Sequence, residues 1–180
     1  MLDNFGIKDV ALQWFHGYLS GRRQIVEIKQ TVDGTTISTR SASREVTRGV
    51  PQGSVLGPVL FILFTCDLSM FMEPYSQTVM FADDTVLITN NKNAKALEIA
   101  TYIAVNMAHD YCIANDLVFN ERKTTQMILG KLKDNISATP NIANVNQTKH
   151  LGVILDDRLS WDAHIESLSL KLNTSLYRLY

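Results

Sequence analysis

The sequence predicts an α+β fold in which an antiparallel sheet carries helices packed on one face. Helical hydrophobic spacing recurs in several long segments, and short β-prone runs bounded by turn residues lie between them. The chain has 180 residues, of which 46% are hydrophobic, which is ordinary for a globular protein. No internal repeat or low-complexity linker divides it.

The N-terminal part predicts a helix followed by a hairpin. The helix covers residues 9–20 and has Trp14 and Tyr18 among the large side chains of its apolar side. A strand over 24–29 follows. The Asp33-Gly34 pair predicts a tight turn, which would close a hairpin onto residues 36–39.

The apolar stretch 55–72 approaches the length of a membrane span. A span needs about 20 predominantly apolar residues with few charges, and this stretch contains Gly57, Pro58 and Asp67. We therefore predict a buried helix over 54–70. Ser54 is suited to cap its N-terminus, and Pro58 falls in the first turn, where its missing N–H costs little.

The C-terminal part alternates strands and helices. Strands over 78–81 and 85–89 flank two aspartates, and strands over 124–129 and 150–155 come later. Asn93 is predicted to cap a helix that runs to about Ala114, and Ser160 a last helix. The apolar positions with helical spacing in these two helices are Leu97, Ala100, Ala104, Met107, Ala108 and Tyr111, and then Trp161, Ile165, Leu168, Leu172, Leu176 and Leu179.

Charge and cysteine content limit the function classes. The net charge of -1 and the pI near 6.4 give no overall basic footprint for a nucleic acid backbone, although local arginines such as Arg22 and Arg48 exist. Cys66 and Cys112 lie in apolar surroundings, which predicts reduced, buried thiols and an intracellular setting in either nucleus or cytoplasm. The four histidines share no metal-ligand spacing.

The most informative stretch is Phe81-Ala82-Asp83-Asp84, in which adjacent carboxylates separate two apolar, β-prone runs. Side chains alternate faces along a strand, so these two carboxylates can share a ligand only if the chain turns there. Carboxylates at a hairpin tip are hard oxygen ligands of the kind that Mg²⁺ or Mn²⁺ requires. A solvated Asp-Asp turn without any ligand remains an alternative at this point.

A second stretch upstream joins glycines to a Pro-Gln pair. Gly49 and Gly53 flank Pro51-Gln52, and Ser54 then precedes the long apolar run. Glycine lets the backbone approach a ligand closely, and Gln52 offers both donors and acceptors. Such a loop is suited to contact a sugar and a base.

With both stretches in this order, the chain resembles the reverse transcriptases of non-LTR, LINE-like retrotransposons. Their palm carries a Gly-x-Pro-Gln-Gly-Ser loop and helix, followed by an aromatic-Ala-Asp-Asp hairpin. Three more blocks extend the resemblance to most of the chain: residues 14–24, 117–124 and 149–165.

The resemblance implies the palm subdomain of a right-hand polymerase, incomplete at both ends. Residues 1–158 would form a partial palm without fingers, and residues 159–180 the start of a connection or thumb helix.

The implied activity is two-metal nucleotidyl transfer, in which a DNA primer is extended with dNTPs along an RNA template. By resemblance, Asp83 and Asp84 are the metal ligands for Mg²⁺ or Mn²⁺, and Lys123 is a proton donor to pyrophosphate. The residues implied in template or substrate binding are Arg48, Gly49, Pro51, Gln52, Gly53, Ser54, Phe81 and Ala82.

One departure from the family is serious. Family palms carry a further metal-binding Asp in a motif of the form Asp-x-x-x-Ala-Phe-Asp, and this sequence contains no such stretch. We therefore expect weak metal binding and no activity from the chain alone. An uncovered edge of the palm sheet is expected to favour self-association, and no membrane contact is expected.

Two alternatives stay open. One is a non-catalytic palm remnant that binds nucleic acid or a protein partner. The other is a metal-dependent phosphohydrolase or nuclease that uses Asp83 and Asp84, although the Pro-Gln loop has no use in that chemistry.

Overall fold

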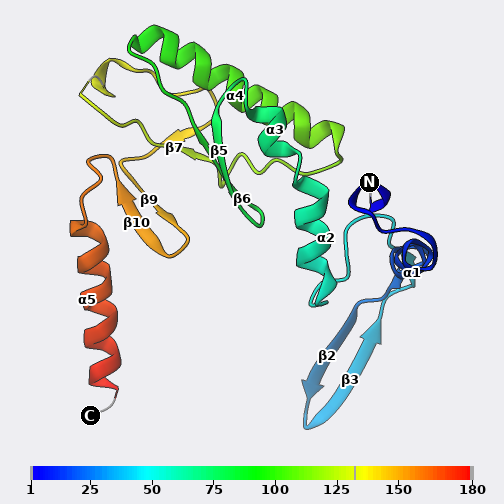
Figure 1. The fold of residues 1–180 in the computed structure, drawn as a ribbon. Coiled ribbons are helices and arrows are strands. Elements are labelled where there is room, and N and C mark those ends of the chain that lie inside the picture. Colours follow the sequence, from blue (N-terminus) through cyan, green and yellow to red (C-terminus); the bar gives the residue numbers. More distant parts are fainter. Residues whose placement is uncertain (1, 132, 179–180) are drawn as a thin grey trace. The chain divides into compact units, whose positions relative to one another are not determined.

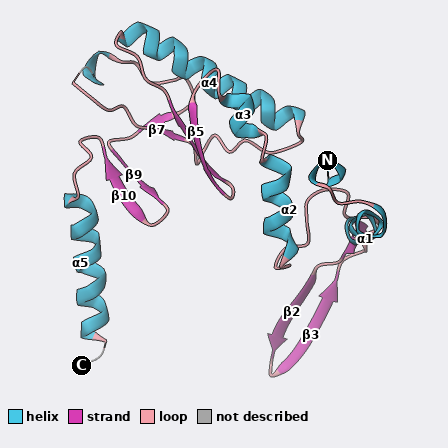
Figure 2. Ribbon diagram, viewed as in Figure 1, coloured by secondary structure: helices cyan, strands magenta, loops and turns pink. Residues whose placement is uncertain are grey.

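A computed structural model describes residues 2–131 and 133–178 of the chain. The chain divides into two compact units, Met1–Asp67 and Leu68–Tyr180, each of which is described by itself. Both units mix helices and strands, as Figure 1 and Figure 2 show. The predicted combination of helices and strands is therefore present.

The first unit contains three helices and two pairs of strands among its described residues. Helix α1 matches the predicted helix within one residue, and Trp14 stacks on Tyr18 along it with ring centroids 5.3 Å apart. The elements are a 3-10 helix at Leu2–Phe5, α1 at Asp9–Leu19, β1 at Arg23–Gln24, β2 at Glu27–Val32, β3 at Thr35–Arg40, β4 at Arg44–Glu45 and α2 at Leu56–Thr65.

The predicted hairpin forms, and its turn has the expected chemistry. Asp33 and Gly34 both have positive φ, 48° and 76°, the sign pattern of a type I′ turn, whose twist matches that of the flanking strands. The predicted strand 24–29 was wrong as a single element. The ladder breaks at 25–26, where the chain leaves its β1 pairing with β4 and begins its β2 pairing with β3.

The predicted helix over 54–70 was also wrong as one continuous element. Helix α2 ends at Thr65, and a separate short helix, α3, covers Leu68–Met72. Thr65, Cys66 and Asp67 are all weak helix formers. The Thr65 hydroxyl donates to the carbonyl of Phe61 at 3.1 Å, a local bond that competes with regular helix continuation.

The core of the second unit lies where α3 and α4 meet the β5–β6 hairpin. Strands β5 (Gln77–Phe81) and β6 (Asp84–Ile88) form the hairpin, and α4 covers Ala94–Ala114. The predicted cap is confirmed, because the Asn93 side chain accepts from the N–H of Ala96 at 3.2 Å. Buried residues at the centre of this core are Leu68, Met72, Ala104, Ala108 and Tyr111, with Tyr75, Met80, Leu87, Met107 and Leu117 packed against them.

Two later strand predictions need correction. Strand β7 covers only Thr125–Gln126 and pairs in parallel with β8 at Ala143–Asn144, not as part of an antiparallel ladder. The predicted strand over 150–155 contains a turn, since β9 (Gln147–His150) and β10 (Val153–Asp156) form a hairpin around Leu151 and Gly152. Strand β9 was not predicted because its sequence is polar and lacks the alternating apolar residues that indicate a strand.

The predicted single antiparallel sheet is absent from the described residues. Ten strands form five separate two-stranded pairs there, four antiparallel and one parallel. Strands as short as β1 and β7 offer too few backbone groups to bridge neighbouring pairs. Helices on one face are nevertheless present at the β5–β6 hairpin, which α3 contacts directly.

The last helix, α5, covers Asp162–Tyr177 and packs against β10. The predicted cap at Ser160 was wrong, because Trp161 occupies the N-cap position. The Ser160 hydroxyl instead donates to the Asp156 carboxylate at 2.5 Å and accepts from the N–H of Asp162 only at 3.4 Å. The predicted apolar residues of this helix are exposed wherever they are described, and Leu179 lies outside the described residues.

The two cysteines differ in environment. Cys112 is half-buried, and burial raises the pKa of its thiol. Cys66 is exposed, so its predicted burial was wrong. It lies just after the end of α2, whereas the prediction placed it inside a longer buried helix. Both thiols are free. No helix within the described part of the chain has the length and apolar character needed to cross a membrane.

Candidate active site

The Asp83-Asp84 pair lies at a tight β-turn. In the β5–β6 ladder Phe81 pairs with Asp84, so Ala82 and Asp83 are the two residues of the hairpin turn. Ala82 has a positive φ of 53°, a conformation that costs a residue with a Cβ about 1–2 kcal/mol. The sequence predicted a turn here, but not that an alanine would occupy its strained position.

The two faces of this hairpin have different surroundings. Met80 and Leu87 pack against the core beneath α3 and α4. Since residues opposite each other in a ladder project to the same face, Phe81 and Asp84 lie together on the other face. Phe81 is 62% exposed, and the side chains of Asp83 and Asp84 are exposed too. The core thus holds the hairpin while its tip presents two carboxylates and an aromatic ring to solvent.

The donor set at the tip fits part of a divalent metal site. Two exposed carboxylates are suitable ligands for Mg²⁺, which keeps several waters and relies on one or two carboxylates together with substrate phosphates. Within 2–131 and 133–178, no three His, Cys, Asp or Glu side chains cluster as a metal site would require. Asp83 and Asp84 are therefore suited to share a metal with further ligands.

The Pro-Gln loop has a defined structure of its own. Gly49 and Gly53 have positive φ of 69° and 78°, so both positions need glycine. The Ser54 hydroxyl donates to the carbonyl of Pro51 at 2.7 Å and accepts from the N–H of Gly57 at 3.0 Å. Ser54 thus caps the first turn of α2 as predicted, but from one residue before the N-cap position, which Val55 occupies. Gln52 is exposed at the turn.

Arg22 anchors the loop from the end of α1. Its guanidinium donates to the carbonyl of Gly49 and more weakly, at 3.4 Å, to that of Arg48, while Nε donates to the carbonyl of Leu19 at 2.9 Å. The planar fork of arginine allows these bonds to be made together. The sequence singled out Arg22 only because it lies in a block that resembles the family. The structure shows that its side chain contacts the Pro-Gln loop and holds it in position.

Gly57 is a site residue that the sequence analysis did not identify. It is buried, and a Cβ built there would lie 3.0 Å from the Ser54 hydroxyl oxygen and 3.3 Å from Val50. Any larger residue would press on the loop from the first turn of α2. The available signal was a glycine three residues after a capping serine, inside a helix where glycine is otherwise unfavourable.

Lys123 lies in a turn after Asn120 and is exposed. Its ammonium forms no ion pair or hydrogen bond with Asp83, Asp84 or any other residue in the described part of the chain. The loop and Arg22 belong to the first unit, and the hairpin and Lys123 to the second. The catalytic and binding roles assigned to these residues remain predictions.

The sequence of this chain is similar to those of known reverse transcriptases. The family model described as "Reverse transcriptase (RNA-dependent DNA polymerase)" matches residues 2–155. The probable RNA-directed DNA polymerase from transposon BS of Drosophila melanogaster is 30% identical over 164 residues, 83% of this chain and 17% of that protein.

Two further relatives agree. The RNA-directed DNA polymerase from mobile element jockey of Drosophila funebris is 27% identical over 159 residues, 83% of this chain and 17% of that protein. The probable RNA-directed DNA polymerase from transposon X-element of Drosophila melanogaster is 27% identical over 177 residues, 91% of this chain and 18% of that protein. The chain thus spans less than a fifth of these relatives' length. No solved structure matches it significantly.

Proposed function

Since the chain belongs to the reverse transcriptase family, whose model matches residues 2–155, we propose that it supplies palm elements of a mobile-element RNA-directed DNA polymerase. The observation that carries this proposal is the tip of the β5–β6 hairpin, where Asp83 in the turn and Asp84 at the start of β6 lie away from the core. Residues 1–158 would belong to the palm, and residues 159–180, which include α5, to a connection or thumb.

The carboxylates of Asp83 and Asp84 would hold Mg²⁺ or Mn²⁺. When bound, such cations supply Lewis acidity to the primer 3′-hydroxyl and to the phosphates of the incoming dNTP. Exposure of both carboxylates leaves coordination positions for water, phosphate and the carboxylate of a further segment.

The other predicted residues would bind and orient the substrates. Phe81 shares a hairpin face with Asp84, so its ring would pack beneath the primer terminus or nucleotide. Gln52 and Gly53, exposed at the tip of an anchored loop, would contact the template or the nascent base pair. Lys123, which is exposed, would give a proton to the leaving pyrophosphate.

The loop would act through its backbone and its position. The carbonyls of Arg48 and Gly49 are held by Arg22, and the Ser54 hydroxyl fixes Pro51 and the start of α2. A loop held at both ends keeps Gln52 in one place, which lowers the entropy lost when a template binds.

A chimeric polymerase tests the proposed activity. Residues 2–155 would replace the matching segment of the jockey polymerase, and the chimera would be assayed for extension of a DNA primer on an RNA template. We expect templated extension that Asp83→Asn lowers by at least about 100-fold, because loss of transition-state electrostatics at a reacting centre typically has that size.

Asp33→Asn is the matched control, since Asp33 also lies in a two-residue hairpin turn and is exposed. It should leave extension unchanged. A folded chimera whose extension is insensitive to Asp83→Asn would overturn the proposal. Binding of an RNA–DNA duplex without any extension would instead favour the role of a non-catalytic binding module.

The predicted partners are an RNA template, a DNA primer and dNTPs. Self-association through an exposed strand edge is the remaining partner prediction. The hairpin of the first unit offers such an edge.

A further inference from the structure

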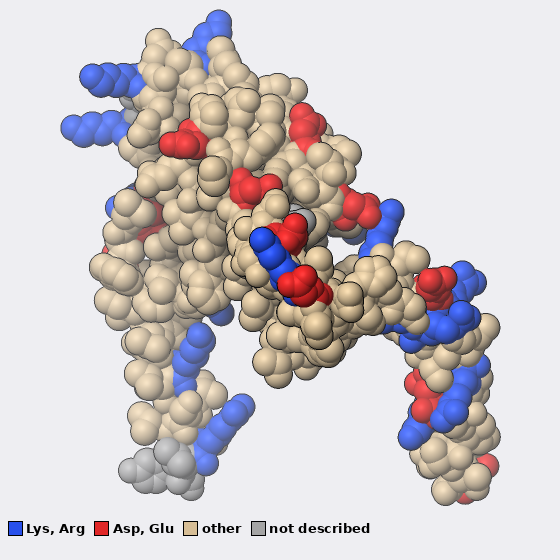
Figure 3. Space-filling model, turned by 45° about the vertical axis from the view of Figure 1, so that its right-hand side comes forward, with Lys and Arg blue, Asp and Glu red and all other residues tan. Residues whose placement is uncertain are grey.

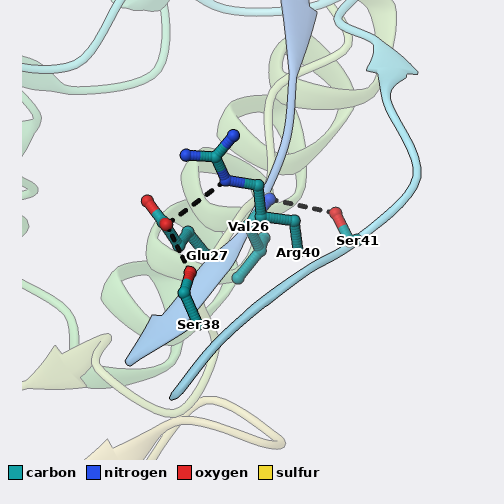
Figure 4. Close-up of polar contacts among 5 residues, drawn as sticks. All are labelled: Val26, Glu27, Ser38, Arg40 and Ser41. Atoms are coloured by element: carbon teal, nitrogen blue, oxygen red, sulfur yellow. Dashed lines mark hydrogen bonds and ion pairs between the residues drawn. The ribbon is translucent and has the colours of Figure 1, made fainter. Parts of the chain in front are cut away.

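The outer edge of β2 is a row of backbone groups without a described partner strand. Strands β2 and β3 pair only with each other among the residues that the structure describes, and every residue in both is exposed. Beyond the Glu27↔Arg40 pair, the N–H of Val26 donates to the Ser41 hydroxyl at 3.0 Å (Figure 4), and the N–H of Ser41 donates to the carbonyl of Val26 at 2.9 Å. This backbone bond determines which residues of β2 are hydrogen-bonded to β3 and which are not.

Hydrogen-bonded and non-hydrogen-bonded pairs alternate along an antiparallel ladder. Since the Val26 pair is hydrogen-bonded, Ile28 and every second residue after it also bond to β3. The backbone groups of Glu27, Lys29 and Thr31 must then point away from β3, toward solvent. Such an edge accepts another antiparallel strand.

The side chains beside this edge carry opposite charges two residues apart. Glu27 accepts from Nε of Arg40 at 3.2 Å and from the Ser38 hydroxyl at 2.5 Å, all on one face of the hairpin (Figure 4). Lys29 lies on the same face, opposite Ser38. Acidic and basic side chains therefore lie close together on the hairpin (Figure 3).

We propose that β2 pairs antiparallel with β2 of a second copy of this chain, with Ile28 opposite Ile28. In this register each Glu27 lies directly opposite Lys29 of the second copy, and two-fold symmetry makes this ion pair twice. Opposite charges in directly opposed cross-strand positions are stabilising. The contact closes as a dimer because the same surface is used by both copies.

Charge also excludes the neighbouring registers. Outward-facing backbone groups stay aligned only if one β2 strand shifts along the other by two residues. Such a shift places either Glu27 opposite Glu27 or Lys29 opposite Lys29, and like charges directly opposite each other are destabilising. The edge of β3 has no such complementarity, because Arg40 is the one charged residue within Thr35–Arg40. Of the two edges of this hairpin, the β2 edge is therefore the one suited to pairing with itself.

The other face of the strand adds an apolar contact. Ile28 is 65% exposed in the single chain. In the proposed register it forms a non-hydrogen-bonded pair with its counterpart, in which side chains approach most closely. Ile37 and Val32, exposed on the same face, extend this apolar strip along each copy.

Reciprocal charge variants test the register. Sedimentation equilibrium of the whole chain should show concentration-dependent dimerisation that Lys29→Glu and Glu27→Lys each weaken by about tenfold or more. A mixture of the two variants should restore association, because one chain is then acidic at both positions and the other basic at both, so each cross-strand pair joins opposite charges. Lys8→Glu, with the same charge change outside the hairpin, should leave dimerisation unchanged.

Amide exchange locates the interface. We expect the N–H groups of Glu27 and Lys29 to gain protection with rising protein concentration, while those of Ser38 and Arg40 do not. A wild-type chain that stays monomeric, a mixture that associates no better than either variant alone, or protection at β3 in place of β2 would each overturn the proposal. Unchanged circular dichroism in the variants would show that their hairpins and helices remain folded.

Discussion

Ala82 is the residue where the local backbone conflicts most clearly with intrinsic preference. Its φ of 53° is easy for glycine and costly for alanine, yet it positions the turn that carries Asp83. Strain of this kind persists where surrounding structure enforces it, and here the core beneath Met80 and Leu87 fixes both strands.

Ala82→Gly should therefore stabilise the chain by about 0.5 kcal/mol, since relief of strain exceeds the added entropy of the unfolded glycine. Denaturant unfolding measures the change. Ala100→Gly, inside α4, is the control of opposite sign and should destabilise by about 1 kcal/mol. A loss of stability in Ala82→Gly would show that the turn does not strain the alanine.

The Asp156 carboxylate holds the segment that leads into α5. The hydroxyl and the N–H of Ser160, followed by the N–H of Arg158, donate to it and hold its pKa below the ordinary value. The pKa is thus lower in the folded than in the unfolded chain. This contribution to stability is present above about pH 4 and is lost as the pH falls through the folded pKa.

Ser160→Ala removes the largest of these contributions and should raise the pKa of Asp156 toward its ordinary value. The rise should be incomplete, because both backbone N–H donors remain. A carboxyl titration followed by NMR measures it, with Ser169→Ala on the exposed part of α5 as control. An unchanged pKa would mean that the hydroxyl does not bond to Asp156 in solution.

At the scale of elements, the start of α2 unites the Pro-Gln loop and a helix in one hydrogen-bonded structure. Ser54 bonds both to the Pro51 carbonyl and to the Gly57 N–H, so the loop and the helix depend on the same hydroxyl. A Cβ at position 57 would lie 3.0 Å from the Ser54 hydroxyl oxygen, so a larger residue there would have to displace that hydroxyl.

Ser54→Ala should lower the free energy of unfolding by about 1 kcal/mol, the usual cost of losing an N-cap. The Gly57 amide, left without its acceptor, should exchange faster with solvent. Ser54→Thr keeps the hydroxyl and should be close to the native chain in both measurements. Equal exchange at Gly57 in the alanine and threonine variants would contradict this role.

At the scale of the whole molecule, the chain contributes too few carboxylates to form a complete catalytic metal site. The hairpin offers two, and no third ligand joins them within the described residues. We expect residues 1–180 alone to give no templated primer extension with Mg²⁺ or Mn²⁺. The intact jockey polymerase is the positive control, and extension by the chain that Asp83→Asn abolishes would refute the expectation.

Metal binding gives a test that does not depend on activity. The segment of the jockey polymerase that precedes the matched region, added as a peptide, should tighten Mn²⁺ binding measured by calorimetry, because a further carboxylate would complete the coordination. We expect a gain of at least about tenfold, which Asp83→Asn should remove and Asp33→Asn should not. Equal affinity with and without the peptide would mean that Asp83 and Asp84 form an ordinary solvated turn.

The sequence by itself determined the features that depend on local chemistry. The Asp33-Gly34 turn, the Asn93 and Ser54 caps and the limits of α1 and α4 follow from backbone preferences and periodic burial within a few residues. The motif order over most of the chain also sufficed to identify the family.

Only the tertiary structure decided which strands pair and where strands and helices break. The polar strand β9, the two-residue strand β7 and the end of α2 at Thr65 depend on partners distant in sequence or on small differences in helix propensity. The same holds for the anchoring of Gly49 by Arg22 and for the β2 edge that no other described strand covers, because neither a long-range hydrogen bond nor an open strand edge leaves a periodic signal in the sequence.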